Sequence, residues 1–190
     1  MLKPSYPIHT ARLTLRPLED RDLNDLFEYY ARPDVVRFLY WETRDLAQTK
    51  QALDQKKQQT ELREEGAGLV LAVSLTETGK VIGEVTLIWR SQEHRQGEMG
   101  FVFNPAFQGH GYATEAARVV LVLGFAGLKL HRIYGRCDAQ NRASYRLMER
   151  LGMRREAHFI QNEIFKGAWG DEMIYAILHD EWQAQQEATP

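Results

Sequence analysis

The chain has 190 residues, a length that fits one domain and can bury a sizeable hydrophobic core. Hydrophobic residues make up 44% and charged residues 26% of the chain, which is typical of folded proteins and excludes a disordered one. The formal net charge of −2 argues against a broad nucleic-acid interface, so we expect no nucleic-acid partner.

Cysteine usage and hydropathy indicate the compartment. The single cysteine, Cys137, excludes an internal disulfide and fits a reducing environment. Residues 1–7 contain no apolar run, so we expect no signal peptide. The longest apolar run, residues 119–128, is far shorter than the roughly 20 residues that span a bilayer. We therefore expect a cytoplasmic protein without membrane association.

The N-terminal third predicts one strand followed by helices. Leu13 and Leu15 alternate with polar residues, which is typical of a half-buried strand. The spacing then predicts a helix over residues 20–30 and a short second helix over residues 33–39. Thr43 is a plausible N-cap for a polar helix that would end at Gly66.

The rest of the chain predicts strands first and then alternating strands and helices. The expected strands are residues 69–74, 81–87, 98–103, 132–138, 154–160 and 173–178, and the expected helices are residues 116–126 and 141–151. This order predicts an α/β (α+β) single domain with a mixed, mostly antiparallel central sheet flanked by helices. We expect the domain to cover residues 1–182 and residues 183–190 to form a polar, disordered tail.

The most informative segment joins an apolar strand to an apolar helix through two glycines. Gly109 and Gly111 lie between the strand that ends at Phe103 and the helix that follows Thr114. A strand that turns through glycines into a helix leaves main-chain N–H groups unpaired, and the positive end of the helix dipole adds to them. The segment therefore predicts an anion site suited to a pyrophosphate.

Two common phosphate loops do not fit this segment. A nucleotide-hydrolase loop needs a Gly-Lys-Ser/Thr sequence, which the chain lacks. The dinucleotide fingerprint needs a third glycine where this chain has Thr114, and no acidic residue follows at the required distance.

What the loop does spell is Gln-x-x-Gly-x-Ala, with Gln108, Gly111 and Ala113. It resembles the acetyl-CoA loop of the GNAT superfamily of N-acetyltransferases, whose signature is Gln/Arg-x-x-Gly-x-Gly/Ala. Residues 10–18, 97–101, 141–153 and 169–178 also resemble segments of its ribosomal-protein alanine acetyltransferase (RimJ/RimL-like) branch. The resemblance covers about residues 9–180 and implies a GNAT-like fold.

The resemblance also implies how the co-substrate acetyl-CoA is bound. It assigns the pantetheine arm and the thioester carbonyl to the main chain of Phe101, Val102 and Phe103. It assigns binding of the phosphates to residues 108–114, which are Gln108, Gly109, His110, Gly111, Tyr112, Ala113 and Thr114. Asn141 resembles the family's cofactor-binding asparagine and is also a plausible helix N-cap.

Acetyl transfer to an amine needs a base, for which Glu98 is the first candidate. It lies three residues before Phe101 in an otherwise apolar strand, where burial would raise the pKa of its carboxyl towards a useful range. A solvated glutamate at a strand edge is an equally good interpretation of Glu98. Glu84, in another expected strand, is the second candidate for the base.

The leaving thiolate has no obvious proton donor. Many superfamily members carry a tyrosine seven residues after the conserved asparagine, where this chain has Met148. Ser144 is the nearest candidate donor and a better candidate for a cofactor contact. A thiol with a pKa near ~8.5 can leave as the anion, so a general acid would add little.

The acceptor site, metal content and assembly are less strongly indicated. Tyr40 and Trp41 follow the short second helix, where the resemblance implies one wall of the substrate cleft. The histidines show no metal-ligand spacing, so we expect no metal. A homodimer is possible, because association through strand edges is common in the superfamily.

The sequence therefore predicts an acetyl-CoA-dependent N-acetyltransferase that acts on a primary amine by direct attack in a ternary complex. The acceptor could be a protein N-terminus or a small molecule such as an amino acid, a polyamine or an aminoglycoside. The alternative is an acyl-CoA-binding sensor that has lost catalysis, which Met148 favours and Glu98 opposes.

Overall fold

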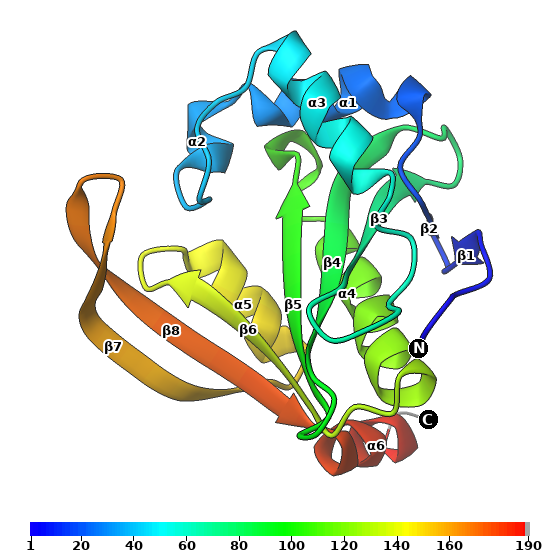
Figure 1. The fold of residues 1–190 in the computed structure, drawn as a ribbon, viewed down its shortest axis with the longest axis vertical. Coiled ribbons are helices and arrows are strands. Elements are labelled where there is room, and N and C mark those ends of the chain that lie inside the picture. Colours follow the sequence, from blue (N-terminus) through cyan, green and yellow to red (C-terminus); the bar gives the residue numbers. More distant parts are fainter. Residues whose placement is uncertain (189–190) are drawn as a thin grey trace.

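The computed structural model describes residues 1–188. Over these residues one eight-stranded sheet has the order β1-β2-β3-β4-β5-β6-β8-β7 (Figure 1). The strands are β1 (Ile8–His9), β2 (Leu13–Arg16), β3 (Gly68–Leu75), β4 (Val81–Ser91), β5 (Gln96–Phe103), β6 (Arg132–Asp138), β7 (Arg154–Phe165) and β8 (Ala168–Leu178). The helices are α1 (Leu23–Tyr30), α2 (Pro33–Val36), α3 (Leu46–Lys56), α4 (Tyr112–Val122), α5 (Arg142–Arg150) and α6 (His179–Glu187). Short turns of helix cover Asp20–Asp22, Pro105–Phe107 and Leu123–Gly127.

The sheet is mostly antiparallel, as the sequence predicts. Within the described residues, β5 and β6 form the parallel pair, and every other neighbouring pair of strands is antiparallel. The long connection from β5 to β6 contains α4, because parallel neighbours need a crossover. The parallel pair therefore lies where the meander of the first half meets the second half.

Helices cover both faces of the sheet. The cluster beneath α1 and α3 buries Tyr29, Tyr30 and Leu53, while the larger cluster on the other face buries Phe125 and Met148. Complete burial of one such side chain contributes about 1.5–3 kcal/mol. These two cores hold the strands between them as a rigid platform.

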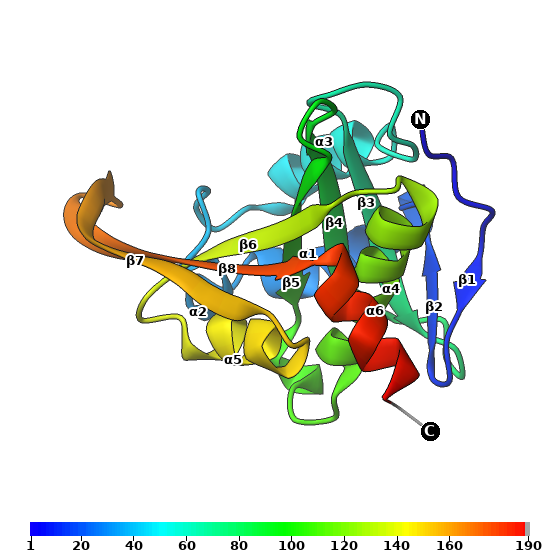
Figure 2. The same cartoon turned by 90° about the horizontal axis from the view of Figure 1, so that it is seen from below.

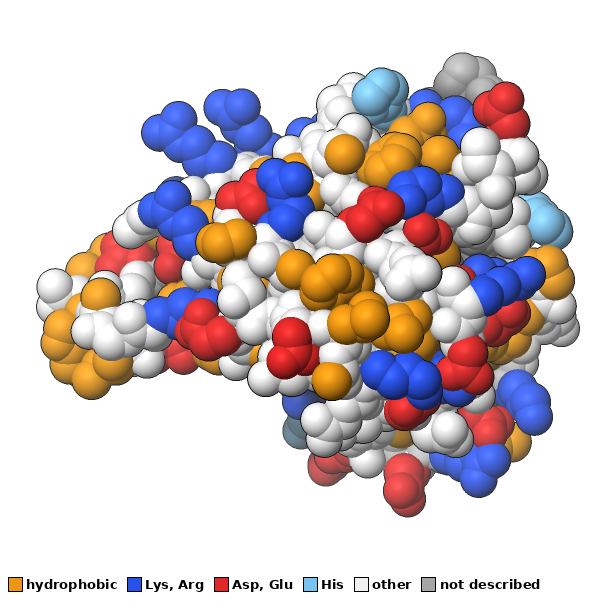
Figure 3. Space-filling model, turned by 90° about the horizontal axis from the view of Figure 1, so that it is seen from above, with side chains coloured by type: hydrophobic (Ala, Val, Ile, Leu, Met, Phe, Trp, Pro, Cys, Tyr) orange, Lys and Arg blue, Asp and Glu red, His pale blue; other side chains and the backbone are white. Residues whose placement is uncertain are grey.

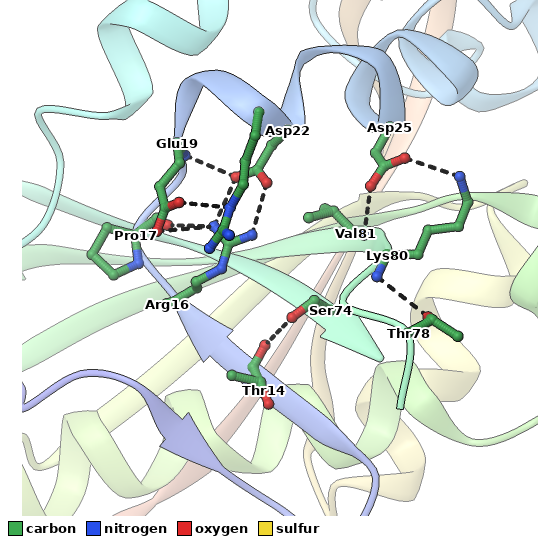
Figure 4. A network of polar contacts seen from close by, with 11 residues as sticks. Thr14, Arg16, Pro17, Glu19, Asp22, Asp25, Ser74, Thr78, Lys80 and Val81 are labelled. Carbon is green, nitrogen blue, oxygen red and sulfur yellow. Dashed lines mark hydrogen bonds and ion pairs between the residues drawn. The ribbon is translucent and has the colours of Figure 1, made fainter. Parts of the chain in front are cut away.

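A buried ion pair fixes β2 to the start of α1 (Figure 4). The Arg16 guanidinium donates to both carboxylate oxygens of Asp22, with N–O distances of 2.8 and 2.7 Å. Asp22 is buried, and it also accepts a hydrogen bond from the main-chain N–H of Glu19. A buried charge needs such partners, so this pair sets the direction in which the chain leaves β2.

The boundaries of α3 differ from the prediction. The N-cap is Asp45, not Thr43, because its side chain accepts from the Gln48 N–H while the Gln48 side chain bonds back to Asp45. This reciprocal capping box satisfies two helix-end donors at once. The helix ends at Lys56 instead of Gly66, and the Gln59 carbonyl beyond it accepts a hydrogen bond from the Val70 N–H of β3.

The C-terminal segment also differs from the expected tail. Helix α6 continues to Glu187, and Trp182 packs on Phe125 with ring centroids 5.3 Å apart. Figure 2 shows α6 beside α4. This aromatic contact ties the segment to the core, whereas composition alone predicts disorder; residues 189–190 lie outside the described residues.

Candidate active site

The parallel strands β5 and β6 separate after three paired residues. The last pair is Glu98 with Tyr134, although β5 continues to Phe103 and β6 to Asp138 (Figure 1). Gly135 lets α5 pack closely on β6, because a Cβ at this position would lie only 2.7 Å from the Met148 sulfur. The divergence leaves one edge of β5 without a partner strand among the described residues.

Main-chain directions along β5 follow from its flanking hydrogen bonds. The Asn104 N–H donates to Ile82 of β4, and the Arg132 N–H of β6 donates to the carbonyl of Arg95. Because main-chain groups alternate along a strand, those of Phe101 and Phe103 face the gap. The main chain of Val102 faces β4, and its side chain packs with the cluster beneath α1 and α3.

The glycine loop follows β5 directly. Gly109 and Gly111 have φ of +83° and +79°, which favour glycine because a Cβ is strained there. Gly111 is the N-cap of α4, and no side chain caps this end among the described residues. The free N–H groups of the first turn, at Tyr112, Ala113 and Thr114, therefore lie at the positive end of the helix dipole.

The His110 side chain contacts other residues of the loop and is not free to bind an anion. Its Nδ1 lies 2.9 Å from the Gln108 carbonyl oxygen, and its ring stacks on Tyr112. His110 therefore contributes its main chain to the loop. Arg150 of α5 reaches the same region, with its Nε 3.3 Å from the Thr114 hydroxyl.

The first turn of α5 faces β6. Asn141 is the N-cap, and its side chain accepts from the Ser144 N–H at 3.2 Å. The buried Ser144 hydroxyl bonds to the Cys137 thiol. Burial raises the pKa of Cys137 to about 11 despite this hydrogen bond, so the thiol stays protonated at neutral pH.

Glu98 is surrounded by charged and hydroxyl groups instead of lying alone in an apolar strand. Arg90 donates to its Oε2 at 2.8 Å, and Arg136 approaches its Oε1 at 3.4 Å. Tyr134 also bonds to Glu98, and burial together with this carboxylate raises the pKa of the Tyr134 hydroxyl. The two guanidinium groups stabilise the charged carboxylate and offset the cost of burying it.

Glu84 lies elsewhere. It is buried beneath α1 and α3, where its Oε1 accepts from the Tyr30 hydroxyl and from Lys56. It lines neither pocket described below. Of the two candidate bases, Glu98 is the one that borders a cavity.

Glu98 lines a narrow cavity of about 100 Å³, which we call the inner pocket. Its charged side chains are five carboxylates and one guanidinium, namely Glu98, Asp138, Glu163, Asp171, Glu172 and Arg136. Arg136 bridges Glu98 and Glu172, at 3.0 Å from the latter. The excess of carboxylates gives the inner pocket a negative potential that favours cations.

The two aromatic residues expected in the acceptor cleft are placed differently. Tyr40 lines the inner pocket, its hydroxyl donates to Glu163 at 2.6 Å, and burial raises the pKa of that hydroxyl to about 12. Trp41 lies outside the lining, because its ring packs between Tyr30 and Arg44, with centroid distances of 4.6 and 4.2 Å. Trp41 therefore supports the wall from behind.

A wider groove of about 720 Å³ continues the inner pocket outward between α2 and the β7–β8 hairpin. Lys166 at the hairpin tip closes one end by donating to the carbonyls of Val36 and Trp41, both at 3.0 Å. The sequence indicated neither Arg136 nor the hairpin glutamates Glu163 and Glu172. An available signal was the pair Asp171 and Glu172, two adjacent carboxylates within an otherwise apolar stretch of β8.

No group of three or more His, Cys, Asp or Glu side chains is placed to hold a metal ion among residues 1–188. Over the same residues, the longest apolar helix is too short to cross a membrane.

An opened sheet edge that leads from a glycine loop to a carboxylate pocket offers room for an extended ligand, with an anion-binding helix end beside it. Residues 12–154 match the family model described as the acetyltransferase (GNAT) domain. The chain belongs to this family of N-acetyltransferases, enzymes that use acetyl-CoA.

Relatives and solved structures agree with this assignment. The chain is 35% identical to the uncharacterized N-acetyltransferase YnaD of Bacillus subtilis (strain 168), across 92% of this chain and 98% of that protein. It is 26% identical to spermidine N(1)-acetyltransferase of Escherichia coli (strain K12), across 93% and 90%. A GNAT-family acetyltransferase structure from Bacillus anthracis matches with a TM-score of 0.82 at 33% identity, across 92% and 99%.

Proposed function

We propose that this N-acetyltransferase transfers the acetyl group of acetyl-CoA directly to a cationic primary amine, with both substrates bound together. The observation that carries the proposal is the position of Glu98. It is the last paired residue before β5 and β6 separate, and its carboxylate lines the inner pocket. One residue thus borders both the gap proposed for the thioester and the pocket proposed for the amine.

Acetyl-CoA would extend from the gap to the glycine loop. Phe101 and Phe103 would bond the pantetheine arm and polarise the thioester carbonyl through main-chain groups that face the gap. Val102 would contribute its side-chain packing instead of its main chain. The N–H groups of residues 108–114 would hold the pyrophosphate, and Asn141 with Ser144 would border the arm on the α5 side.

Glu98 would act as the base. The inner pocket attracts the amine as a cation, but only the neutral amine can attack. Glu98 would therefore accept the first proton, directly or through one water, before the nitrogen bonds to the carbonyl carbon. The nitrogen would lose its second proton to water as the C–S bond breaks. The thiol leaves as the anion without a strong donor, because its ordinary pKa is only about 8.5. Ser144 is the nearest hydroxyl on α5, although its bond to Cys137 weakens its case as a donor.

The acidic lining favours acceptors that carry positive charge. A polyamine fits this charge, and the spermidine-acetylating relative supports it. A protein N-terminus would use the wider groove for its following residues, and the likeness of residues 10–18 and 141–153 to ribosomal-protein alanine acetyltransferases supports that acceptor. Both classes present a primary amine to Glu98.

An amine panel tests the proposal. Release of the CoA thiol is measured with spermidine, alanine-initiated peptides, amino acids and an aminoglycoside, for the wild type and for Glu98→Gln. We expect turnover with at least one cationic amine and its loss in the variant, while Glu64→Gln, an exposed carboxylate, behaves as the wild type. Tight acetyl-CoA binding without turnover on any amine would instead favour the sensor.

We also propose that the chain forms a homodimer through the β7–β8 hairpin. Large exposed hydrophobic side chains gather on this projecting hairpin (Figure 3), namely Phe159, Ile160, Ile164 and Trp169. An apolar patch of this kind marks an interaction surface. Light scattering should find a dimer that Ile164→Asp dissociates, whereas Val122→Asp, an exposed position on α4, leaves it intact.

A further inference from the structure

The segment before β2 is bonded to the first turn of α4, about a hundred residues away. The Arg12 Nε donates to Glu115 Oε2 at 2.8 Å, and its main-chain N–H donates to Glu115 Oε1 at 2.9 Å. The Thr10 hydroxyl donates to the same Oε1 at 2.6 Å. We call these residues, together with His110, the Arg12–Glu115 clamp.

The clamp reaches three consecutive residues of the glycine loop. The Arg12 Nη1 donates to the His110 carbonyl at 2.8 Å, and its guanidinium lies over the Tyr112 ring, 4.7 Å from the centroid. A Cβ on Gly111 would lie 3.5 Å from the Arg12 Nη2. Arg12 therefore fixes the loop at the residues that present its main-chain N–H groups.

Charge gives the clamp a second effect. Glu115 lies in the first turn of α4, beside the proposed pyrophosphate site. A carboxylate at this position stabilises the helix through its interaction with the helix dipole, but it repels a bound anion. The hydrogen bonds from Thr10 and Arg12 outweigh burial and lower the pKa of Glu115, so it remains ionised. The adjacent guanidinium, 2.7 Å away, is what neutralises it.

We propose that Arg12 is a positioning residue for the phosphates of the co-substrate: it holds the glycine loop through His110 and screens the charge of Glu115. The inference rests on the proposed function of the loop. It also gives a role to residues 10–12, which lie directly before β2 and far in sequence from the site.

The test compares two thioesters that differ in their phosphates. Calorimetry measures the binding of acetyl-CoA and of S-acetylpantetheine, which lacks the phosphates, to the wild type, R12Q, E115Q and R12Q/E115Q. We expect R12Q to weaken acetyl-CoA binding about tenfold, the scale of one charge-assisted hydrogen bond. S-acetylpantetheine binding should change by less than about twofold, because the loop contacts only the phosphates. R63Q, which breaks the surface pair with Glu61, is the matched control.

The double variant separates the two effects of the clamp. If Arg12 screens Glu115, R12Q/E115Q binds acetyl-CoA more tightly than R12Q does. Equal binding in wild type and R12Q, or equal losses for both thioesters, would overturn the proposal, and additive effects would overturn its charge argument. If R12Q does not fold, R12K keeps the charge but loses the fork, and it tests the contact with the loop by the same comparison of the two thioesters. A wild type that binds neither thioester would instead refute the proposed function.

Discussion

The glycine loop and the inner pocket both adjoin β5, but they are assembled over different distances along the chain. The loop is one continuous segment, residues 104–114, whose shape depends on two positive-φ glycines and the start of α4. The inner pocket combines side chains from β5, β6, the β7–β8 hairpin and the segment after α2. Changes in the loop should therefore affect the co-substrate alone, and changes in the pocket should affect the acceptor alone.

The largest effect is expected at the junction of the two regions. Glu98→Gln should lower kcat by about 10²- to 10⁴-fold, the usual contribution of a general base. Calorimetry should find acetyl-CoA binding nearly unchanged, because the side chain faces the pocket and not the loop. A normal kcat in this variant would remove Glu98 from the chemistry.

The Cys137 thiol also lines the inner pocket, and its rate of alkylation depends on how deeply it is buried. With its pKa raised to about 11, Cys137 should react with iodoacetamide at pH 8 about 100-fold more slowly than a free cysteine. The neutral thiol stabilises the fold below the ordinary thiol pKa, and this contribution is lost as pH rises from there towards 11. Mass spectrometry of the alkylated protein across pH measures the alkylation rate, and fast alkylation at pH 8 would contradict the raised pKa of Cys137.

The loop can be broken by strain at one glycine. Gly111→Val forces a β-branched residue to φ of +79° and costs about 1–3 kcal/mol, so acetyl-CoA should bind about tenfold more weakly or worse. Gly79→Val provides the control, since Gly79 has φ of +73° in the β3–β4 turn with open space around it. If both variants lowered the affinity equally, the effect would come from general instability.

The smallest effect concerns acceptor affinity. Glu163→Gln keeps the shape and can still accept from the Tyr40 hydroxyl, but it removes one negative charge from the pocket. We expect the KM for a cationic amine to rise a few-fold, about 1 kcal/mol or less, and acetyl-CoA binding to stay constant. Steady-state kinetics at two salt concentrations measure it, and an unchanged KM at low salt would argue against electrostatic attraction.

Local patterns explain which site residues could be predicted. Gly109 and Gly111 are recognisable because a strand, a turn and a helix follow one another without interruption, and Asn141 because a helix begins directly after it. Asp45 had an equally local signal, an aspartate three residues before Gln48, which the choice of Thr43 overlooked. Trp41 could not be separated from Tyr40 by position, since neighbouring residues point to different surroundings.

The sequence by itself determined the family, the order of most strands and helices, the glycine loop and the candidate base, because each depends on residues close together in the chain. Tertiary structure decided what surrounds them. Arg136 and Glu172 meet Glu98 only where β6 and β8 lie beside β5, and Arg12 meets Glu115 only because β2 passes the start of α4. Charged contacts between distant segments leave no periodic signal, since their partners are chosen by the packing of the sheet and helices.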